Sequence, residues 1–242
     1  MNLAIDIGNT LSKAAVIDDG QVVDIFKTET FTPAYLEKLF KRYPKVGRGI
    51  LISTRGAEEE LTAFLKNKLA TFIRFDHTTP VPVKNAYTTP ETLGRDRLAA
   101  AVGAAALHPG EGSLVVDFGT AITVDFVDAG GTFRGGNISP GAATRFRALH
   151  EFTKKLPLRE LTDETQFLAT SSQQAIESGV INGIVYEIEG YIRTLSDKNE
   201  QFHIIFTGGD GNFFAKRLNY PIFASQDLVL YGLNKILEYN AQ

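Results

Sequence analysis

The chain has 242 residues, of which 25 are Lys or Arg and 28 are Asp or Glu, so its formal net charge at pH 7 is −3. This acidic balance argues against a nucleic-acid-binding protein, because neutralising a phosphate backbone requires a basic face. The absence of cysteine excludes disulfides and thiol catalysis. The chain has neither the pattern of a signal peptide nor the run of about 18 apolar residues that spans a membrane. We therefore expect a cytoplasmic protein with no nucleic-acid and no membrane partner.

The first part of the chain alternates between strand-like and helix-like patterns. Short apolar runs bounded by turn residues predict strands, and apolar residues spaced by three and four predict helices. In chain order we expect strands at 2–8, 12–18 and 21–26, a helix at 32–43, a strand at 49–53, a helix at 57–69 and a strand at 71–75. The turn residues Asp18-Asp19-Gly20 predict a tight hairpin between the second and third strands.

The segment 76–92 carries three prolines and no clear periodicity, so it predicts a loop. Loops of more than about 15 residues in compact domains are usually functional. This one leads into Leu93-Gly94-Arg95-Asp96-Arg97 and then an Ala-rich helix at 98–107, which His108-Pro109-Gly110 ends. We place the domain boundary there and predict an N-terminal domain at 1–110 and a C-terminal domain at 111–242.

The second part of the chain repeats the order of the first. In chain order we expect strands at 113–118, 121–127 and 132–138, a helix ending near 151, a polar stretch, a long helix at about 172–195, a strand at 203–206, a turn at 207–209 and a helix from about 227. Three antiparallel strands followed by helix and strand units, in duplicate, predict an α/β fold with a mixed sheet in each half.

The clearest internal repeat joins residues 3–10 to residues 114–121. In each copy an apolar run ends in an aspartate, Asp6 or Asp117, and a glycine and a threonine follow before a second apolar run. Such a strand, turn and return strand brings backbone N–H groups, a hydroxyl and a carboxylate to one place. Two such places facing each other would make a nucleotide cleft.

Three motifs resemble those of the acetate and sugar kinase, Hsc70 and actin superfamily: Asp6-x-Gly8-Asn9-Thr10, Asp117-Phe118-Gly119-Thr120 and Thr207-Gly208-Gly209. Within that superfamily, the motif at 93–97, the block at 117–125 and the segment 135–141 resemble type III pantothenate kinase, and the likeness runs in order from residue 2 to the motif at 227–233. The resemblance implies duplicated ribonuclease H-like domains of the actin-like ATPase type. It also implies ATP-dependent phosphorylation of pantothenate to 4′-phosphopantothenate, the first step of coenzyme A biosynthesis.

The resemblance assigns the first turn to ATP. The residues expected to bind ATP there are Asp6, Ile7, Gly8, Asn9, Thr10, Leu11, Ser12 and Lys13. Backbone amides and small hydroxyl side chains suit phosphate oxygens, and a lysine adds a positive charge. Because Asp6 would repel phosphate directly, we expect a magnesium ion or water between them.

In the second half, the resemblance assigns Asp117 to a monovalent cation, potassium or ammonium, and Thr120 to the ATP phosphates. Gly208 and Gly209 would let adenine or ribose rest on bare backbone. Asp125 is a weaker candidate, which could instead pair within its own hairpin.

The resemblance also assigns a substrate site around 93–97. Asp96 would be the general base that takes the proton from the primary hydroxyl of pantothenate. Arg97 suits the pantothenate carboxylate, because a planar guanidinium can hold a carboxylate by two bonds. The other residues expected to bind substrate are Tyr87, Gly94, Arg95 and Ser172, the last standing where the family usually has threonine.

The long helix at about 172–195 carries a wide apolar stripe: Ala175, Ile176, Val180, Ile181, Ile184, Val185, Ile188 and Ile192. This width indicates either a helix shared with a second subunit, in agreement with the homodimers that the resemblance implies, or a helix that covers its own sheet. Two other functions stay open on the residues alone. The chain could be a kinase for another small hydroxylated acid or sugar, or a non-catalytic ATP-binding regulator on the same scaffold.

Overall fold

The structure is a computed structural model, and it describes residues 1–198 and 201–241. The chain divides into two compact units. The first contains Met1–Ser113, Asp125–Gly135 and Asp227–Gln242, and the second contains Leu114–Val124 and Gly136–Gln226. Within the described residues, no helix combines the length and the apolar character needed to cross a bilayer.

Five strands form a mixed sheet in the first unit, in the order β3-β2-β1-β4-β5. Their bounds are β1 (Asn2–Ile7), β2 (Ser12–Asp18), β3 (Gln21–Thr28), β4 (Arg48–Ser53) and β5 (Thr71–Arg74). The first three are antiparallel, whereas β4 runs parallel to β1 and β5 parallel to β4. The predicted hairpin turn is confirmed, with positive φ angles of 46° at Asp19 and 74° at Gly20.

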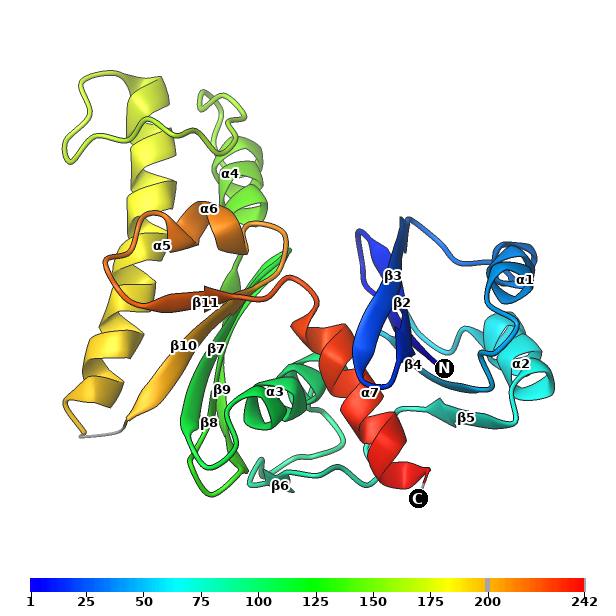
Figure 1. Ribbon diagram of the computed structural model, residues 1–242. Helices are drawn as coiled ribbons and strands as arrows, with labels where there is room; N and C mark the ends of the chain where they lie inside the picture. The colour runs from blue at the N-terminus through cyan, green and yellow to red at the C-terminus, as the bar shows by residue number, and fades with distance from the viewer. Residues whose placement is uncertain (199–200, 242) are drawn as a thin grey trace. The chain divides into compact units, whose positions relative to one another are not determined.

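Helices cover both faces of this sheet (Figure 1). On one face, α1 (Pro33–Arg42) and α2 (Glu59–Lys68) pack on a core that includes Leu3, Ile5 and Leu51. On the other face, α7 (Leu228–Asn240) packs against β1 and β4, and α3 (Arg95–Leu107) packs on α7. A Cβ on Gly232 of α7 would overlap the carbonyl of Ala99 in α3, so the small residues of these helices allow a close crossing.

The second sheet has the order β11-β10-β7-β8-β9-β6. Its strands are β6 (Lys84–Asn85), β7 (Gly112–Phe118), β8 (Ala121–Val127), β9 (Thr132–Pro140), β10 (Phe202–Thr207) and β11 (Ile222–Ala224). Five of them repeat the arrangement of the first sheet, since β9-β8-β7-β10-β11 corresponds to β3-β2-β1-β4-β5. This shared order confirms the duplicated α/β fold that the sequence repeat predicts.

Three helices belong to the second unit: α4 (Ala142–Glu151), α5 (Ser172–Ser196) and α6 (Gly211–Ala215). Helices α4 and α5 pack together, and α6 packs against β10 and β11. Phe118 at the end of β7 lies 4.8 Å from Phe206 and 4.9 Å from Phe214, measured between ring centroids. These aromatic contacts join the ends of β7, β10 and α6.

The elements differ from the sequence expectation in two respects. The segment 76–92 was expected to be a loop throughout, but it contains β6, and 220–226 contains β11. These strands have two and three residues and form by pairing with distant partners, which leaves no periodic signal. Helix α3 begins at Arg95 and not at Leu98, because its first turn consists of charged residues that precede the Ala-rich run.

Candidate active site

The first Asp-Gly-Thr turn joins β1 to β2. Asp6 pairs across the hairpin with Lys13, and Ile7 pairs with Ser12, so the turn itself consists of residues 8–11. Asn9, Thr10 and Leu11 are exposed. The side chain of Ser12 is buried and donates to the carbonyl of Glu29 at 3.1 Å. Any contact of Ser12 with a ligand would therefore come from its backbone.

Two residues that follow β4 contact this turn, because the carboxyl end of β4 lies beside that of β1. The backbone N–H of Thr54 donates to the carbonyl of Ile7 at 2.9 Å. The Arg55 Nε donates to the carbonyl of Gly8 at 2.7 Å. Arg55 thus adds a positive charge beside the turn. The sequence motifs do not indicate Arg55, although the carboxyl end of a strand parallel to β1 is where an α/β fold places ligand-binding groups.

Lys13 lies on the return strand. Its Nζ is 3.8 Å from Oδ1 of Asp227, the residue that precedes α7. The first turn is therefore bordered by two cations, Lys13 and Arg55, and an arrangement of exposed backbone beside cations suits anionic oxygens.

The second Asp-Gly-Thr turn joins β7 to β8 in the other unit, and other backbone segments pack closely on it. The Thr120 carbonyl accepts the N–H of Gly141 at 3.0 Å and the hydroxyl of Thr144 at 2.7 Å. A Cβ on Gly141 would overlap the carbonyl oxygen of Gly119. This is the physical reason for glycine at the start of α4.

The Thr207-Gly208-Gly209 turn packs against the end of the strand that carries Asp117. Gly208 has φ +85°, and a Cβ there would lie 2.5 Å from the Phe118 carbonyl oxygen and would overlap the Asp117 carboxylate. The N–H of Asp210 donates to the Phe118 carbonyl at 3.2 Å. The structure therefore brings Asp117 and Gly208 together within one unit.

A cavity of about 560 Å³ adjoins this turn. It is lined by Asp210 and by residues of α4 and of the segment that follows: Ala143, Phe146, Arg147, Leu158, Arg159, Glu160 and Leu161. Burial raises the pKa of Asp210 above its ordinary value, because a desolvated carboxyl group favours its neutral form. The cavity lining thus combines two arginines, two acids and several apolar side chains.

The motif at 93–97 forms the start of α3. Gly94 is the residue before the helix, and Asp96 lies in its first turn, half-buried, with Oδ1 accepting the N–H of Arg97 at 2.9 Å. A Cβ on Gly94 would lie 2.6 Å from this same oxygen. Glycine therefore leaves room for the Asp96 carboxylate. Arg95 points to the preceding loop and bonds the carbonyl of Pro90.

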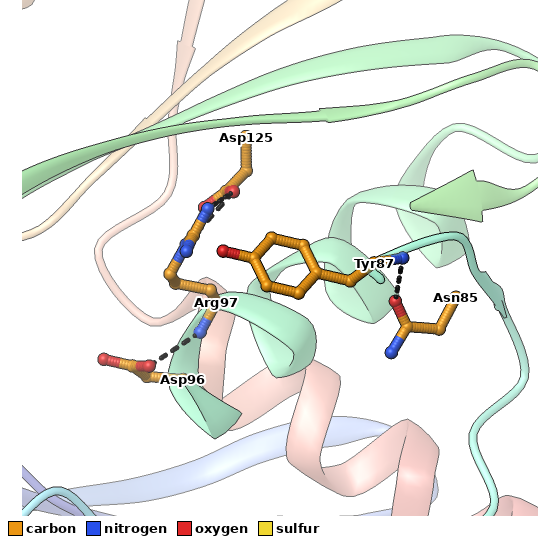
Figure 2. A network of polar contacts seen from close by, with 5 residues as sticks. All are labelled: Asn85, Tyr87, Asp96, Arg97 and Asp125. Atoms are coloured by element: carbon orange, nitrogen blue, oxygen red, sulfur yellow. Dashed lines mark hydrogen bonds and ion pairs between the residues drawn. The ribbon is translucent and has the colours of Figure 1, made fainter. Parts of the chain in front are cut away.

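Arg97 and Tyr87 lie together in the first unit, as the sequence analysis expects of two substrate ligands, but Arg97 also has a partner from β8 (Figure 2). The Asp125 carboxylate accepts from Arg97 Nε and Nη2, the shortest of these bonds being 2.6 Å. The Arg97 and Asp125 side chains are only 5% and 2% exposed. Burial acts to lower the pKa of Arg97, but Asp125 and the Tyr87 hydroxyl outweigh it, so the pKa is raised and the cation persists.

Comparison with known proteins shows the family of this chain. The sequence pattern of type III pantothenate kinase matches residues 2–194. The chain belongs to the type III pantothenate kinase family. Proteins of that name from Phocaeicola vulgatus and Bacteroides fragilis strain ATCC 25285 are 45% and 42% identical to it over 240 residues, covering 99% of this chain and 99% and 98% of theirs.

The fold has relatives among solved structures at much lower identity. The activator of 2-hydroxyisocaproyl-CoA dehydratase from Clostridium difficile, solved with bound ADPNP, superposes with a TM-score of 0.58 at 13% identity, covering 99% of this chain and 95% of that one. MreB5 of Spiroplasma citri, bound to ADP, superposes with a TM-score of 0.50 at 12% identity, with 99% and 96% covered. These likenesses show the fold alone, which is the duplicated ribonuclease H-like fold of actin-like ATPases. The type III pantothenate kinase family catalyses ATP-dependent phosphorylation of pantothenate, and the chain is an enzyme of that class.

The remaining predicted ligand, Ser172, is the first residue of α5 and is exposed. Its neighbour Ser171 caps the helix by accepting the N–H of Gln174 at 3.4 Å. The apolar stripe of α5 is buried within the chain except for Ala175. The width of this stripe is therefore explained by packing within the protein and does not require a second subunit.

Asp125 has a partner that its position in the sequence does not indicate. Pairing within its own hairpin was considered, whereas the structure pairs it with Arg97 of α3, 28 residues earlier in the chain. The signal that could have found it is its position in the middle of an apolar strand, since a charge placed there needs a buried partner.

Proposed function

We propose that this chain transfers the γ-phosphoryl group of ATP to the primary hydroxyl of pantothenate, with Asp96 as the general base. The hydroxyl oxygen attacks the γ-phosphorus, the bond from that phosphorus to the β,γ-bridging oxygen breaks, the hydroxyl proton passes to Asp96, and ADP leaves. The observation that carries the proposal is the first turn of α3. There a half-buried carboxylate, with space left by Gly94, precedes Arg97, whose guanidinium lies over the Tyr87 ring, and these two side chains suit an acidic substrate.

The ATP phosphates are assigned to both Asp-Gly-Thr turns. At the first, the backbone of residues 7–12, the side chains of Asn9 and Thr10, and the Lys13 ammonium would hold phosphate oxygens. At the second, Thr120 would contact phosphate, while the backbone of Gly208 and Gly209 would support the adenosine. The cavity beside Asp210 has a suitable size and an apolar floor for part of that group.

Two cations complete the proposal. A magnesium ion would bind the ATP phosphates and, through water, Asp6, and it would neutralise the charge that develops during transfer. This fits a single carboxylate at the end of β1, since magnesium is usually held by one or two carboxylates together with substrate phosphates. Among the described residues, no group of three or more His, Cys, Asp or Glu residues is arranged to hold a metal by itself.

The monovalent cation, potassium or ammonium, is assigned to Asp117. The Asp117 carboxylate and the Phe118 carbonyl both lie against the Gly208 backbone, so oxygen atoms of the kind that such a cation prefers are gathered at this point. The proposal predicts faster turnover in potassium than in sodium.

We also propose a homodimer, in which Ser172 contacts the pantothenate bound by the partner subunit. Support comes from exposed apolar side chains in the segment after α4 and on α5 itself: Phe152 (87% exposed), Phe167 (84%), Leu168 (78%) and Tyr186 (52%). Exposed aromatic side chains of this kind are typical of interfaces. Light scattering during size exclusion tests the mass. We further propose that the enzyme acts in the cytoplasm, where ATP is available for coenzyme A biosynthesis.

A coupled assay of ADP release, run with and without pantothenate, tests the role of Asp96. Substitution Asp96→Asn keeps the shape of the side chain and removes the base, so kcat is expected to fall by about 10²- to 10⁴-fold while the KM for ATP stays near that of the wild type. Glu91→Gln, an exposed carboxylate that precedes the same helix, is the matched control and should keep full activity. Full turnover by Asp96→Asn would remove Asp96 as the base.

A further inference from the structure

Asp125 is a buried acid in the middle of β8, and its side chain is 2% exposed. A carboxylate at that depth is unfavourable unless a cation and hydrogen bonds compensate for lost water. Arg97 provides both, from the first turn of α3. Both residues belong to the first unit, and the pair holds the helix that carries the proposed base to Asp125 within that unit.

The contact uses one defined edge of the guanidinium group. Arg97 Nε lies 3.1 Å and 3.0 Å from the two carboxylate oxygens of Asp125, and Nη2 lies 2.6 Å from Oδ1. Guanidinium is planar and has five N–H donors, so an acid on the edge of Nε and Nη2 leaves a second edge, formed by Nη1 and Nη2, pointing away from it. That second edge has the geometry to hold another carboxylate by two parallel bonds.

The Tyr87 ring lies against one face of the Arg97 guanidinium group. The centre of the guanidinium lies 5.7 Å from the Tyr87 ring centroid, within the range of a cation–π contact. The ring itself packs 6.2 Å from that of Phe133, and the Tyr87 N–H donates to the side-chain oxygen of Asn85 at 3.0 Å. In Figure 2 the Tyr87 hydroxyl points towards the Arg97 side chain. Asp125 and Tyr87 therefore hold the guanidinium from one edge and one face.

We infer that Asp125 is a positioning residue for substrate recognition, which fixes Arg97 so that the guanidinium edge formed by Nη1 and Nη2 receives the pantothenate carboxylate. The inference rests on the proposed role of Arg97 as the ligand of that carboxylate. An arginine held by a buried acid loses little rotamer freedom when it binds a second carboxylate, and this preorganisation favours binding. Selectivity for an acidic substrate thus depends on a residue that does not touch the substrate.

A purely structural ion pair is the competing explanation, in which Asp125 only anchors α3 to β8. The two explanations differ in what they predict for a substrate without a carboxylate. Loss of a structural anchor would impair turnover of charged and neutral substrates equally, whereas loss of positioning would impair the charged one selectively.

The experiment compares pantothenate with the neutral analogue in which a CH₂OH group replaces the carboxylate, and reports the ratio of their kcat/KM values. Asp125→Asn keeps the shape but accepts at one atom only, so it releases part of the Arg97 contact. We expect the ratio of kcat/KM for pantothenate to kcat/KM for the neutral analogue to fall at least about tenfold, through a higher KM for pantothenate. The KM for ATP should change less than about twofold. An unchanged or increased preference would overturn the inference.

Arg97→Gln separates this inference from the proposed function. If Arg97→Gln narrows the preference and Asp125→Asn does not, Arg97 recognises the carboxylate without help from Asp125, and only the inference is wrong. If Arg97→Gln leaves the preference unchanged, Arg97 is not the carboxylate ligand, and both the inference and that part of the proposed function are wrong.

Stability is monitored in parallel, because Asp125→Asn leaves a buried arginine with a weaker partner. Asp128→Asn is the matched control. Asp128 lies three residues after Asp125, and its substitution breaks another arginine–carboxylate pair, the one with Arg134. It should lower the melting temperature and keep the substrate preference. If Asp125→Asn fails to fold, Asp125→Glu replaces it. That variant keeps the charge but moves the guanidinium by the length of a methylene, so it should narrow the preference as well, and a wild-type preference would overturn the inference.

Discussion

The two Asp-Gly-Thr turns share a sequence pattern but differ in what surrounds them. In the first, at residues 8–11, three of the four residues, Asn9, Thr10 and Leu11, are exposed, and the cations of Lys13 and Arg55 lie beside the turn. Gly119 and Thr120 of the second turn are exposed as well, but backbone packs closely on this turn and its strand, since a Cβ on Gly141 or on Gly208 would overlap atoms of residues 117–120.

The charges around the turns differ in the same way. Arg55 bonds the backbone of the first turn, and Lys13 lies opposite Asp6. The second turn is bordered by Asp117 and, beyond Gly208, by the desolvated Asp210. The repeated pattern therefore specifies the strand, turn and carboxylate, while the surrounding segments place two cations beside the first turn and closely packed backbone and two carboxyl groups beside the second. Substitutions should accordingly impair binding at the first turn and folding at the second.

The largest effect is expected from Gly141→Ala. The new Cβ would overlap the Gly119 carbonyl and lie 2.9 Å from that of Thr120, and backbone atoms cannot rotate away as a side chain can. We expect the free energy of unfolding to fall by about 3 kcal/mol, measured by urea titration. Gly179→Ala in α5 is the control, since its Cβ would meet open space, and it should be neutral or stabilising by up to about 1 kcal/mol. Equal stability of the two variants would contradict the packed-backbone account of the second turn.

Much of this fold could be predicted from the sequence because most of its helices and strands have a pattern of apolar residues within their own segment. The strands of both hairpins and the long helix of the second unit carry clear periodicity, and the repeated turn indicated the duplication. Strands β6 and β11 could not be predicted, since each owes its existence to pairing with a distant strand.

The residues of the candidate site likewise differ in how far the sequence predicts them. Residues named by a local motif, such as Asp96 and Lys13, could be proposed from the sequence, but Arg55 and the partner of Asp125 could not. Arg55 reaches the first turn because β4 pairs with β1, and Asp125 reaches Arg97 because the fold of the first unit brings residues 28 positions apart together. Both contacts depend on the folded topology, which no spacing of residues along the chain encodes.

The next largest effect concerns charge at the first turn. Lys13→Met removes the ammonium while keeping most of the apolar stem, so kcat/KM for ATP is expected to fall by about a hundredfold. The melting temperature should change little, because the 3.8 Å contact with Asp227 contributes weakly as an ion pair. Lys27→Met is the control, since Lys27 lies directly opposite Lys13 on β3 and is exposed. A similar loss in both variants would show that the effect is not specific to the turn.

A smaller effect is expected at Arg55. Arg55→Gln removes the bond to the Gly8 carbonyl and the charge beside the turn, so the KM for ATP should rise about fivefold, in line with about 1 kcal/mol for an exposed charged hydrogen bond. The rise should shrink at high salt, because exposed charges are screened. Arg42→Gln, which breaks an exposed pair with Asp24 in the same unit, should leave the KM for ATP unchanged. If Arg55→Gln behaves like Arg42→Gln, Arg55 only supports the local structure.

The smallest effect concerns the acid beside the second turn. The pKa of Asp210 is raised by burial, so its ionised form destabilises the folded state above the pKa of the unfolded chain, and protonation removes that penalty as the pH falls. Asp210→Asn should therefore raise the melting temperature slightly at pH 7, with the gain vanishing towards about pH 4.

Asp128→Asn should do the reverse. Burial acts to raise the pKa of Asp128, but the Thr132 N–H and Arg134 outweigh it and lower the pKa. The ionised form therefore stabilises the fold above the pKa of the unfolded chain, and this stabilisation is lost as the pH falls through the lowered pKa. The variant should melt earlier at pH 7 and approach the wild type in acid. If the change in melting temperature relative to wild type depends on pH in the same way for Asp210→Asn and Asp128→Asn, the ionised form of Asp210 does not destabilise the fold. The contrast in charge between the turns would then rest on Lys13 and Arg55 alone.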